Sequence, residues 1–78
     1  MVTYPCQWQY RIICSDDRAV HRLIADYAGD APYCLTPGPG RIQGIYKDLV
    51  VEMTVYSDYH RFHLHELLTD EPSVKVVL

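Results

Sequence analysis

Two stretches of alternating residues, each followed directly by a helix signal, constrain this fold more than any other feature of the sequence. Apolar and other residues alternate over Gln7–Ser15 and again over Ile45–Ser57. A period of two is typical of a strand that buries one face. The expected core-facing residues are Trp8, Tyr10, Ile12 and Cys14 in the first strand, and Leu49, Val51, Met53 and Val55 in the second.

Each of these strands is followed by residues that begin a helix. Ser15-Asp16-Asp17 offers an N-cap and first-turn carboxylates, and Ser57-Asp58 offers a second cap. Asp16 and Asp17 could also be an acid–base pair, but adjacent carboxylates at a helix start more often cap free amides. The first helix, which carries one apolar stripe, ends at Gly29 before Pro32, and the second runs from Tyr59 to Thr69. The stripe is made of Val20, Leu23, Ile24, Tyr27 and Ala28, and the second helix contains Leu64, Leu67 and Leu68.

Two shorter strands complete the pattern, at Tyr33–Thr36 and at the closing segment, where Val74, Val76 and Leu78 alternate with Lys75 and Val77. The order is therefore β-α-β-β-α-β. Right-handed crossovers place both helices on one face of a four-stranded antiparallel sheet. The sequence predicts a single ferredoxin-like α+β domain over residues 1–78. A chain of 78 residues buries only about 60% of its unfolded surface, which leaves little room for an enclosed active-site cavity.

Charge and cysteine content narrow the class of protein further. Seven Lys and Arg residues against ten Asp and Glu residues give a net charge of −3, which argues against nucleic-acid binding. Cys6, Cys14 and Cys34 form no CxxC pair, so we expect neither a zinc ribbon nor a disulfide framework, but free thiols. The sequence shows no signal-peptide pattern and no apolar run of about 18 residues, so we expect a cytoplasmic protein without a membrane span.

Three segments of the sequence carry recognisable motifs. Tyr4–Ile13 has an aromatic-Pro pair before an aromatic-x-Tyr-basic strand, Gly44–Val51 has a Gly-x-Tyr start, and Asp70–Leu78 ends in Val-Leu. In this order, the three segments resemble the YbeD-like family of small bacterial proteins. The loop Pro37–Arg41 and His65 depart from the family pattern. The resemblance implies a ferredoxin-like fold similar to ACT regulatory domains, no established activity and no catalytic residues to carry over.

The cluster from His60 to Glu66 is the most suggestive group of polar residues. On a helix His60 and His63 are neighbours, as are His63 and Glu66, and two imidazoles with a carboxylate could bind zinc or nickel. His65 points elsewhere, and the HExxH spacing is absent. The alternative, which we favour, is that His60 and His63 are solvated and that His65 packs as an aromatic ring at the helix–sheet boundary.

Three other motifs have a structural interpretation that we favour over a functional one. Pro37-Gly38-Pro39-Gly40 lacks the phosphate-loop pattern and predicts a turn or loop. Cys6 has no nearby histidine in the sequence to activate it as a nucleophile, so a structural thiol is expected. The seven tyrosines, interleaved with Arg11, Arg41 and Lys47, could stack RNA bases, but no RNP-like run is present.

The open face of the sheet is the predicted contact surface. Alternation assigns nine residues to this face: Gln9, Arg11, Ile13, Val50, Glu52, Thr54, Tyr56, Lys75 and Val77. Four of the nine are apolar or aromatic. A contiguous apolar patch often marks an interface, although an ordinary mixed sheet face is the alternative. We expect a homodimer or a protein partner to contact Arg11, Ile13, Val50, Tyr56 and Val77.

These features favour a non-enzymatic regulatory or binding module that takes a small ligand or a protein partner and needs no cofactor. The alternative from another class is a metal-binding protein that uses His60, His63 and Glu66. An enzyme is the least favoured reading, because no convergent catalytic set is visible in so short a chain.

Overall fold

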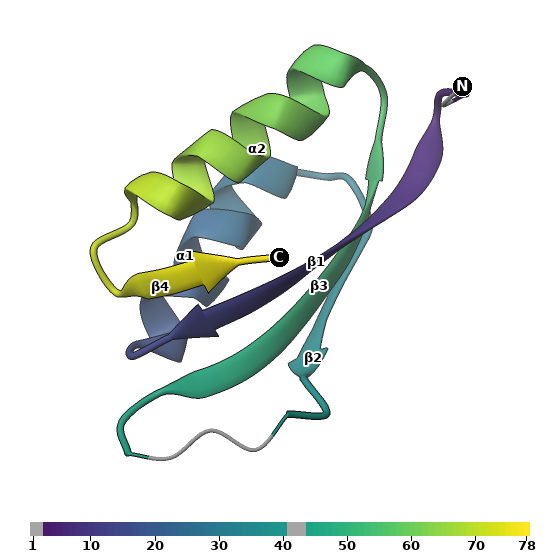
Figure 1. The fold of residues 1–78 in the computed structure, drawn as a ribbon. Coiled ribbons are helices and arrows are strands. Elements are labelled where there is room, and N and C mark those ends of the chain that lie inside the picture. The colour runs from purple at the N-terminus through teal and green to yellow at the C-terminus, as the bar shows by residue number, and fades with distance from the viewer. Residues whose placement is uncertain (1–2, 41–43) are drawn as a thin grey trace.

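The computed structural model describes residues 3–40 and 44–78, in which the elements follow the expected order (Figure 1). Arg41, at the end of the predicted loop, lies outside the described residues. The strands are β1 (Cys6–Cys14), β2 (Tyr33–Pro37), β3 (Lys47–Val55) and β4 (Val74–Val77). The helices are α1 (Asp17–Ala28) and α2 (Asp58–Asp70).

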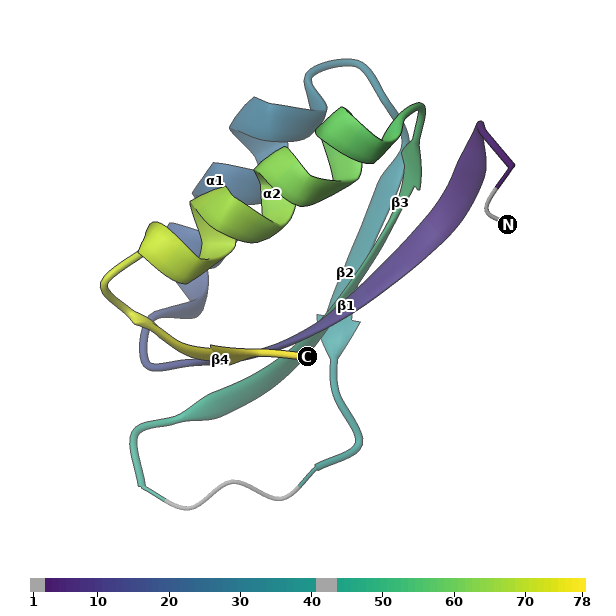
Figure 2. The same cartoon turned by 45° about the horizontal axis from the view of Figure 1, so that its top comes forward.

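The strands form one sheet in the order β2-β3-β1-β4, and every neighbouring pair is antiparallel. Both helices cover the same face of this sheet, and the other face is open (Figure 2). β1 and β3 pair along their whole length, from Cys6 opposite Val55 to Cys14 opposite Lys47. The predicted ferredoxin-like α+β fold is confirmed. Neither helix in the described part of the chain has the length and apolar run needed to cross a membrane.

The helix caps are those that the sequence predicts. The Asp16 side chain accepts hydrogen bonds from the N–H groups of Arg18 and Ala19, at 3.0 and 3.3 Å. The Ser57 hydroxyl accepts from the His60 N–H at 3.0 Å. α1 ends at Gly29, whose φ of 58° is in the left-handed region. Because these caps satisfy amides that a helix leaves unpaired, each helix starts at a defined residue.

The core lies between the sheet and the two helices. The predicted core-facing residues of β3 are all buried, as are Tyr10, Ile12 and Cys14 of β1, while Trp8 is half-buried at the margin. From the helices, the buried residues are Val20, Ile24, Ala28, Leu64 and Leu68. The helix-facing side of the long strands therefore corresponds to the prediction residue by residue.

β4 differs from the prediction in which side chains face the core. The pairing of β1 with β4 shifts between Ile13 and Cys14, so that Val77 lies opposite Ile12, Val76 opposite Ile13 and Val74 opposite Cys14. This bulge inserts one extra residue and interrupts the period of two. Val77 therefore packs against the core, and the prediction that it lies on the open face is wrong. Val76 occupies the open-face position instead.

Candidate functional site

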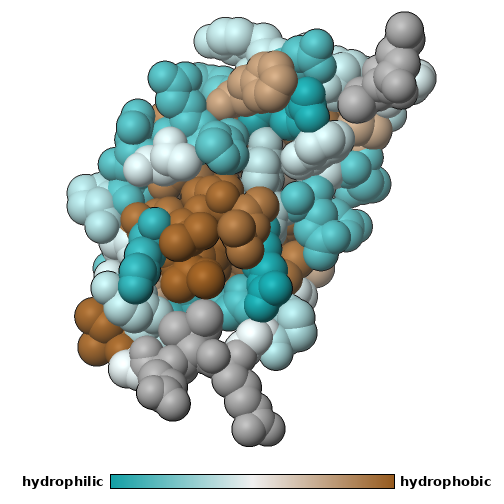
Figure 3. Space-filling view, in the orientation of Figure 1, coloured by the Kyte–Doolittle hydropathy of each residue, from teal (hydrophilic) through white to brown (hydrophobic). Residues whose placement is uncertain are grey.

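The predicted contact residues do not form one surface. Arg11, Ile13 and Val50 share the open face through the β1–β3 register. Tyr56 follows the end of β3, and its ring stacks on His60 with centroids 5.9 Å apart, so it lies at the start of α2 rather than on the sheet. A hydrophobic patch nevertheless gathers over β4 and its surroundings (Figure 3). Of the predicted contact residues, Arg11, Ile13 and Val50 therefore lie on the open face, and Val76 lies there as well.

Arg11 is not free on that face, because it is paired with Asp48. Its Nη2 lies 2.6 Å from Asp48 Oδ2, and its Nε also donates to the carboxylate. The Gly40 N–H donates to Asp48 Oδ2 at 2.9 Å. The Arg11 guanidinium holds the pKa of Asp48 below its usual value. The hydrogen bond from the Gly40 amide also lowers this pKa, whereas burial of the carboxylate raises it. Pro37 is the last residue of β2, and Gly38–Gly40 continue as an irregular loop that approaches the Asp48 carboxylate, as the loop alternative predicts.

The α2 histidines are surrounded by tyrosine rings. His60 stacks on Tyr27 at 5.1 Å, and its Nδ1 accepts a hydrogen bond from the Tyr56 N–H at 3.2 Å. His63 contacts the rings of Tyr27 and Tyr59 at 5.5 and 5.4 Å. Both histidines are half-buried and therefore only partly solvated. Within residues 3–40 and 44–78, no three His, Cys, Asp or Glu side chains gather in a way that could hold a metal ion, and this applies to His60, His63 and Glu66.

His65 lies near the helix–sheet boundary, as predicted, with its ring 6.0 Å from that of Tyr10, although the residue is exposed to solvent. The three cysteines are unpaired, with Cys14 buried, Cys6 half-buried and Cys34 exposed. Burial raises the pKa of the Cys14 thiol above its usual value, which disfavours its reactive thiolate form.

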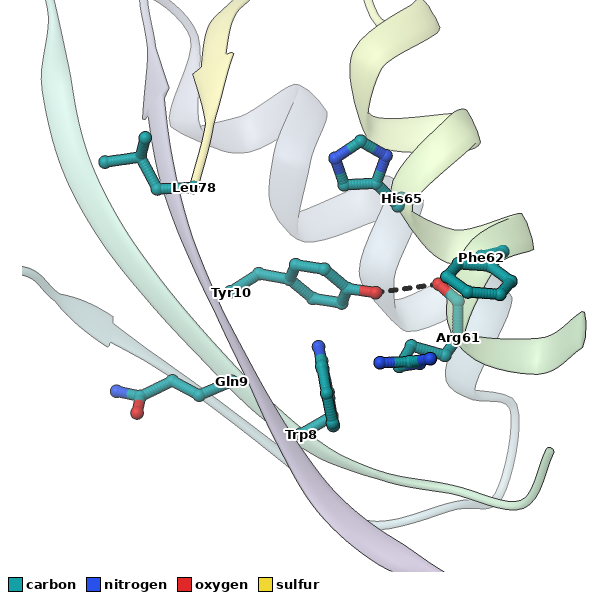
Figure 4. Close-up of a pocket in the computed structure, with 7 residues that line it drawn as sticks. All are labelled: Trp8, Gln9, Tyr10, Arg61, Phe62, His65 and Leu78. Carbon is teal, nitrogen blue, oxygen red and sulfur yellow. Dashed lines mark hydrogen bonds between the residues drawn. The ribbon is translucent and has the colours of Figure 1, made fainter. Parts of the chain in front are cut away.

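A pocket of about 450 Å³ opens between β1 and α2 (Figure 4). Its lining is mainly apolar and comes from Trp8, Gln9 and Tyr10 of β1, Arg61, Phe62 and His65 of α2, and Leu78. Its volume falls in the range of about 300–1,000 Å³ that is usual for small-ligand sites. It is a shallow, open pocket at one side of the molecule, not an enclosed cavity.

Arg61 is the charged group of this pocket. Its guanidinium carbon lies 4.2 Å from the centroid of the Trp8 ring and 4.5 Å from that of Phe62. Arg61 Nη2 lies 3.5 Å from Asp58 Oδ1, in an ion pair that is weak at this distance, and Asp58 also accepts a hydrogen bond from the Tyr4 hydroxyl. In the described structure Arg61 Nε is buried without an acceptor. This guanidinium therefore has more N–H donors than it has acceptors among the described residues.

Tyr10 fixes the position of α2 above the pocket. Its hydroxyl donates to the backbone carbonyl of Arg61 at 2.7 Å, and the dashed line in Figure 4 marks this bond. A tyrosine hydroxyl is protonated at neutral pH, and burial raises the pKa of Tyr10 further above its usual value of about 10. The bond joins β1 to α2 directly below Arg61.

Sequence reasoning placed Trp8 and Tyr10 on the helix-facing side but did not single out Arg61 or Phe62. The sequence pointed to these two residues only weakly, because Arg61 and Phe62 are a single basic residue and its aromatic neighbour on a helix that mixes polar and apolar residues. The contact between Arg61 and Trp8 depends on how α2 packs across β1, and the spacing of residues along the sequence does not predict this packing.

Fold and pocket together define the class: a small ferredoxin-like α+β domain with an open, mainly apolar pocket that carries one arginine beside its sheet. The chain belongs to the family described as "Protein of unknown function (DUF493)", which matches residues 1–78. The resemblance to YbeD-like proteins is thereby confirmed. No curated protein matches the sequence.

Several solved structures are similar to this chain. The solution structure of protein HP0495 from H. pylori has a TM-score of 0.84 at 21% identity, over 100% of this chain and 86% of that one. The C-terminal domain of the MgtC protein from Mycobacterium tuberculosis has a TM-score of 0.71 at 17% identity, over 100% of this chain and 88% of that one. At these identities, the likeness is one of fold.

Proposed function

We infer that this protein is a non-enzymatic binding module with a regulatory role, and that the pocket between β1 and α2 binds a ligand that carries a carboxylate. The observation behind this inference is Arg61, whose guanidinium lies between the rings of Trp8 and Phe62 and whose Nε has no acceptor among the described residues. The proposed place of action is the cytoplasm, a compartment that suits three unpaired cysteines, one of them exposed.

An anion is the ligand that best fits this guanidinium. Hydrogen bonds between arginine and a carboxylate are roughly twice as strong as neutral ones, and they gain further when water is excluded. The two rings hold the guanidinium in place, so little side-chain entropy is lost when a ligand binds. The apolar lining from Trp8 and Phe62 would contact the hydrocarbon part of the same ligand.

The lining also supports binding rather than catalysis. Its titratable side chains are those of Tyr10, Arg61 and His65. The Tyr10 hydroxyl is already bonded to a backbone carbonyl, and none of the lining residues is a Ser, Cys, Asp or Glu that His65 could activate or orient.

The experiment uses Trp8, the single tryptophan of the chain, as its probe. Phenylbutyrate, which combines a ring with a carboxylate, should change Trp8 fluorescence and raise the melting temperature, because a ligand of the folded state stabilises it. Phenylbutyramide, which lacks the charge, should bind at least about tenfold more weakly. Arg61→Gln should remove this preference, and Arg22→Gln, an exposed arginine of α1, is the matched control. Equal binding of acid and amide to the wild type, or no binding of either, would refute the proposal.

A further inference from the structure

The edge of β1 that faces β4 is only partly paired. β4 pairs with Ile12–Cys14, and beyond it Arg11 exchanges two backbone hydrogen bonds with Leu78, at 3.1 and 2.7 Å. Backbone groups of successive strand residues point to opposite sides, so the N–H and C=O of Gln9 and Gln7 point the same way as those of Arg11. No backbone group in the described residues pairs with them on this side.

This unpaired edge runs along the pocket. Trp8 and Tyr10, which alternate with Gln7 and Gln9, direct their side chains toward α2 and line the pocket (Figure 4). Both glutamines are exposed, so the edge is accessible. Exposed main-chain donors and acceptors therefore lie beside an apolar pocket that contains an arginine.

An extended segment added in line with β4 would use both features. Running antiparallel to β1, it would exchange hydrogen bonds with Gln9 and then with Gln7. Its residues opposite Tyr10 and Trp8 would point to the helix-facing side, into the pocket, and would be separated by one residue. Addition of a strand to a sheet edge is a known mode of peptide recognition.

We propose that the partner is an extended segment of another protein, with an apolar residue opposite Tyr10 and, two positions later, an acidic residue opposite Trp8. Arg61 lies over the Trp8 ring, which places the carboxylate there. The position opposite Tyr10 lies near the rings of Tyr10 and His65, which are 6.0 Å apart, and directly after Leu78, which also lines the pocket; this surrounding suits a hydrocarbon side chain. This inference rests on the proposed function of the pocket and adds the class of its ligand.

The test uses a capped heptapeptide of Thr and Val residues with Leu and Glu two positions apart at its centre. Binding should change Trp8 fluorescence and shift the amide resonances of Gln7 and Gln9 in NMR spectra. Two matched peptides are the controls: one with Gln in place of Glu, and one N-methylated at the residue opposite Gln9. Each should bind at least about tenfold more weakly, the first through loss of charge and the second through loss of a strand hydrogen bond.

A protein variant tests the same contact from the other side. Gln9→Pro removes the N–H that faces the ligand and leaves the bonds to β3 in place, since proline is tolerated at a sheet edge. We expect it to lose peptide binding by at least about tenfold. Gln7 faces the same edge but does not line the pocket, so Gln7→Pro should weaken peptide binding and still bind phenylbutyrate as the wild type does. The N-methylated peptide on the wild type gives the same information if Gln9→Pro folds poorly.

The outcomes separate this inference from the function on which it rests. If phenylbutyrate binds and the peptides do not, strand addition is wrong and the pocket's function stands. If neither binds, both are wrong. Undiminished binding of the N-methylated peptide would refute strand pairing, and a wild-type dimer that Gln9→Pro dissociates would identify a second copy of this chain as the occupant instead.

Discussion

Asp48 shows how a single residue can contradict the pattern around it. Alternation places it on the open face, where a carboxylate predicts exposure, yet its side chain is only 2% exposed. It lies opposite Ile13 in the register, which brings Arg11 within reach on the same face of the neighbouring strand. The pair, completed by the Gly40 amide, lets the sheet bury a charge on its open side.

The first prediction concerns the pH dependence that this carboxylate creates. The pKa of Asp48 is lower in the folded protein than in the unfolded chain, so its stabilisation is present above the unfolded value of about 3.9 and is lost as the pH falls through the lower folded value. Asp48→Asn should lower the free energy of unfolding at neutral pH and flatten its decline below about pH 4. Urea unfolding across this pH range measures both effects.

The control for this experiment is Asp17→Asn. Lys47 lowers the pKa of Asp17 as well, but this pair is more exposed and salt should screen it. An Asp48→Asn protein with the wild-type acid profile would show that the Arg11 pair does not stabilise the fold.

At the scale of elements, the bulge in the β1–β4 pairing decides which side of β4 is buried. Val74 and Val77 both pack on the core, although three positions separate them, and Val76 faces the open side opposite Ile13. A strand with strict alternation would have buried Val74 and Val76 together.

The second prediction follows from this assignment. Val77→Asp puts a charge against the core and should lower the free energy of unfolding by about 2–4 kcal/mol, whereas Val76→Asp on the open side should cost less than about 1 kcal/mol. Urea unfolding of both variants measures these free energies, which can be compared if the m-values are unchanged. The reverse ranking would mean that β4 pairs without the bulge.

The sequence was sufficient for those parts of the fold that local chemistry determines. The alternation of Leu49, Val51, Met53 and Val55 gave the buried face of β3, and the residues Asp16 and Ser57 gave the helix starts. The bulge was not predictable, because a short valine-rich strand satisfies either register.

The pocket was also beyond sequence reasoning. Trp8 and Arg61 are far apart in the chain, and their contact is set by the packing of α2 on β1. The burial of Asp48 depends likewise on a partner in another strand and on a loop amide.

For the whole molecule, the asymmetry between the two faces of the sheet is the main surface feature. One face is covered by both helices, and the other carries half-buried Ile13, Val50 and Val76, near a hydrophobic patch over β4 (Figure 3). Apolar surface gathered in this way favours contact with a protein, and of the two expected partners we propose a second copy of this chain.

The third prediction concerns self-association through this face. Sedimentation of the wild type should show an average mass that rises with concentration, and Val50→Asp should return it to that of a monomer, because a charge would be buried without a partner. Ala25→Asp, at an exposed position of α1 and therefore away from the open face, is a control for added charge. A wild type that remains monomeric at every concentration tested contradicts the proposed interface.

The close approach of the loop to Asp48 also restricts how this sequence can vary. A Cβ built on Gly38 would lie 2.5 Å from the Asp48 carboxyl carbon, and one built on Gly40 would lie 2.5 Å from Asp48 Oδ2. A side chain at either position would therefore force the carboxylate away from Arg11. Positions 38, 40 and 48 should consequently change together among related sequences: where a relative has a side chain in place of Gly40, a residue smaller than aspartate is expected in place of Asp48.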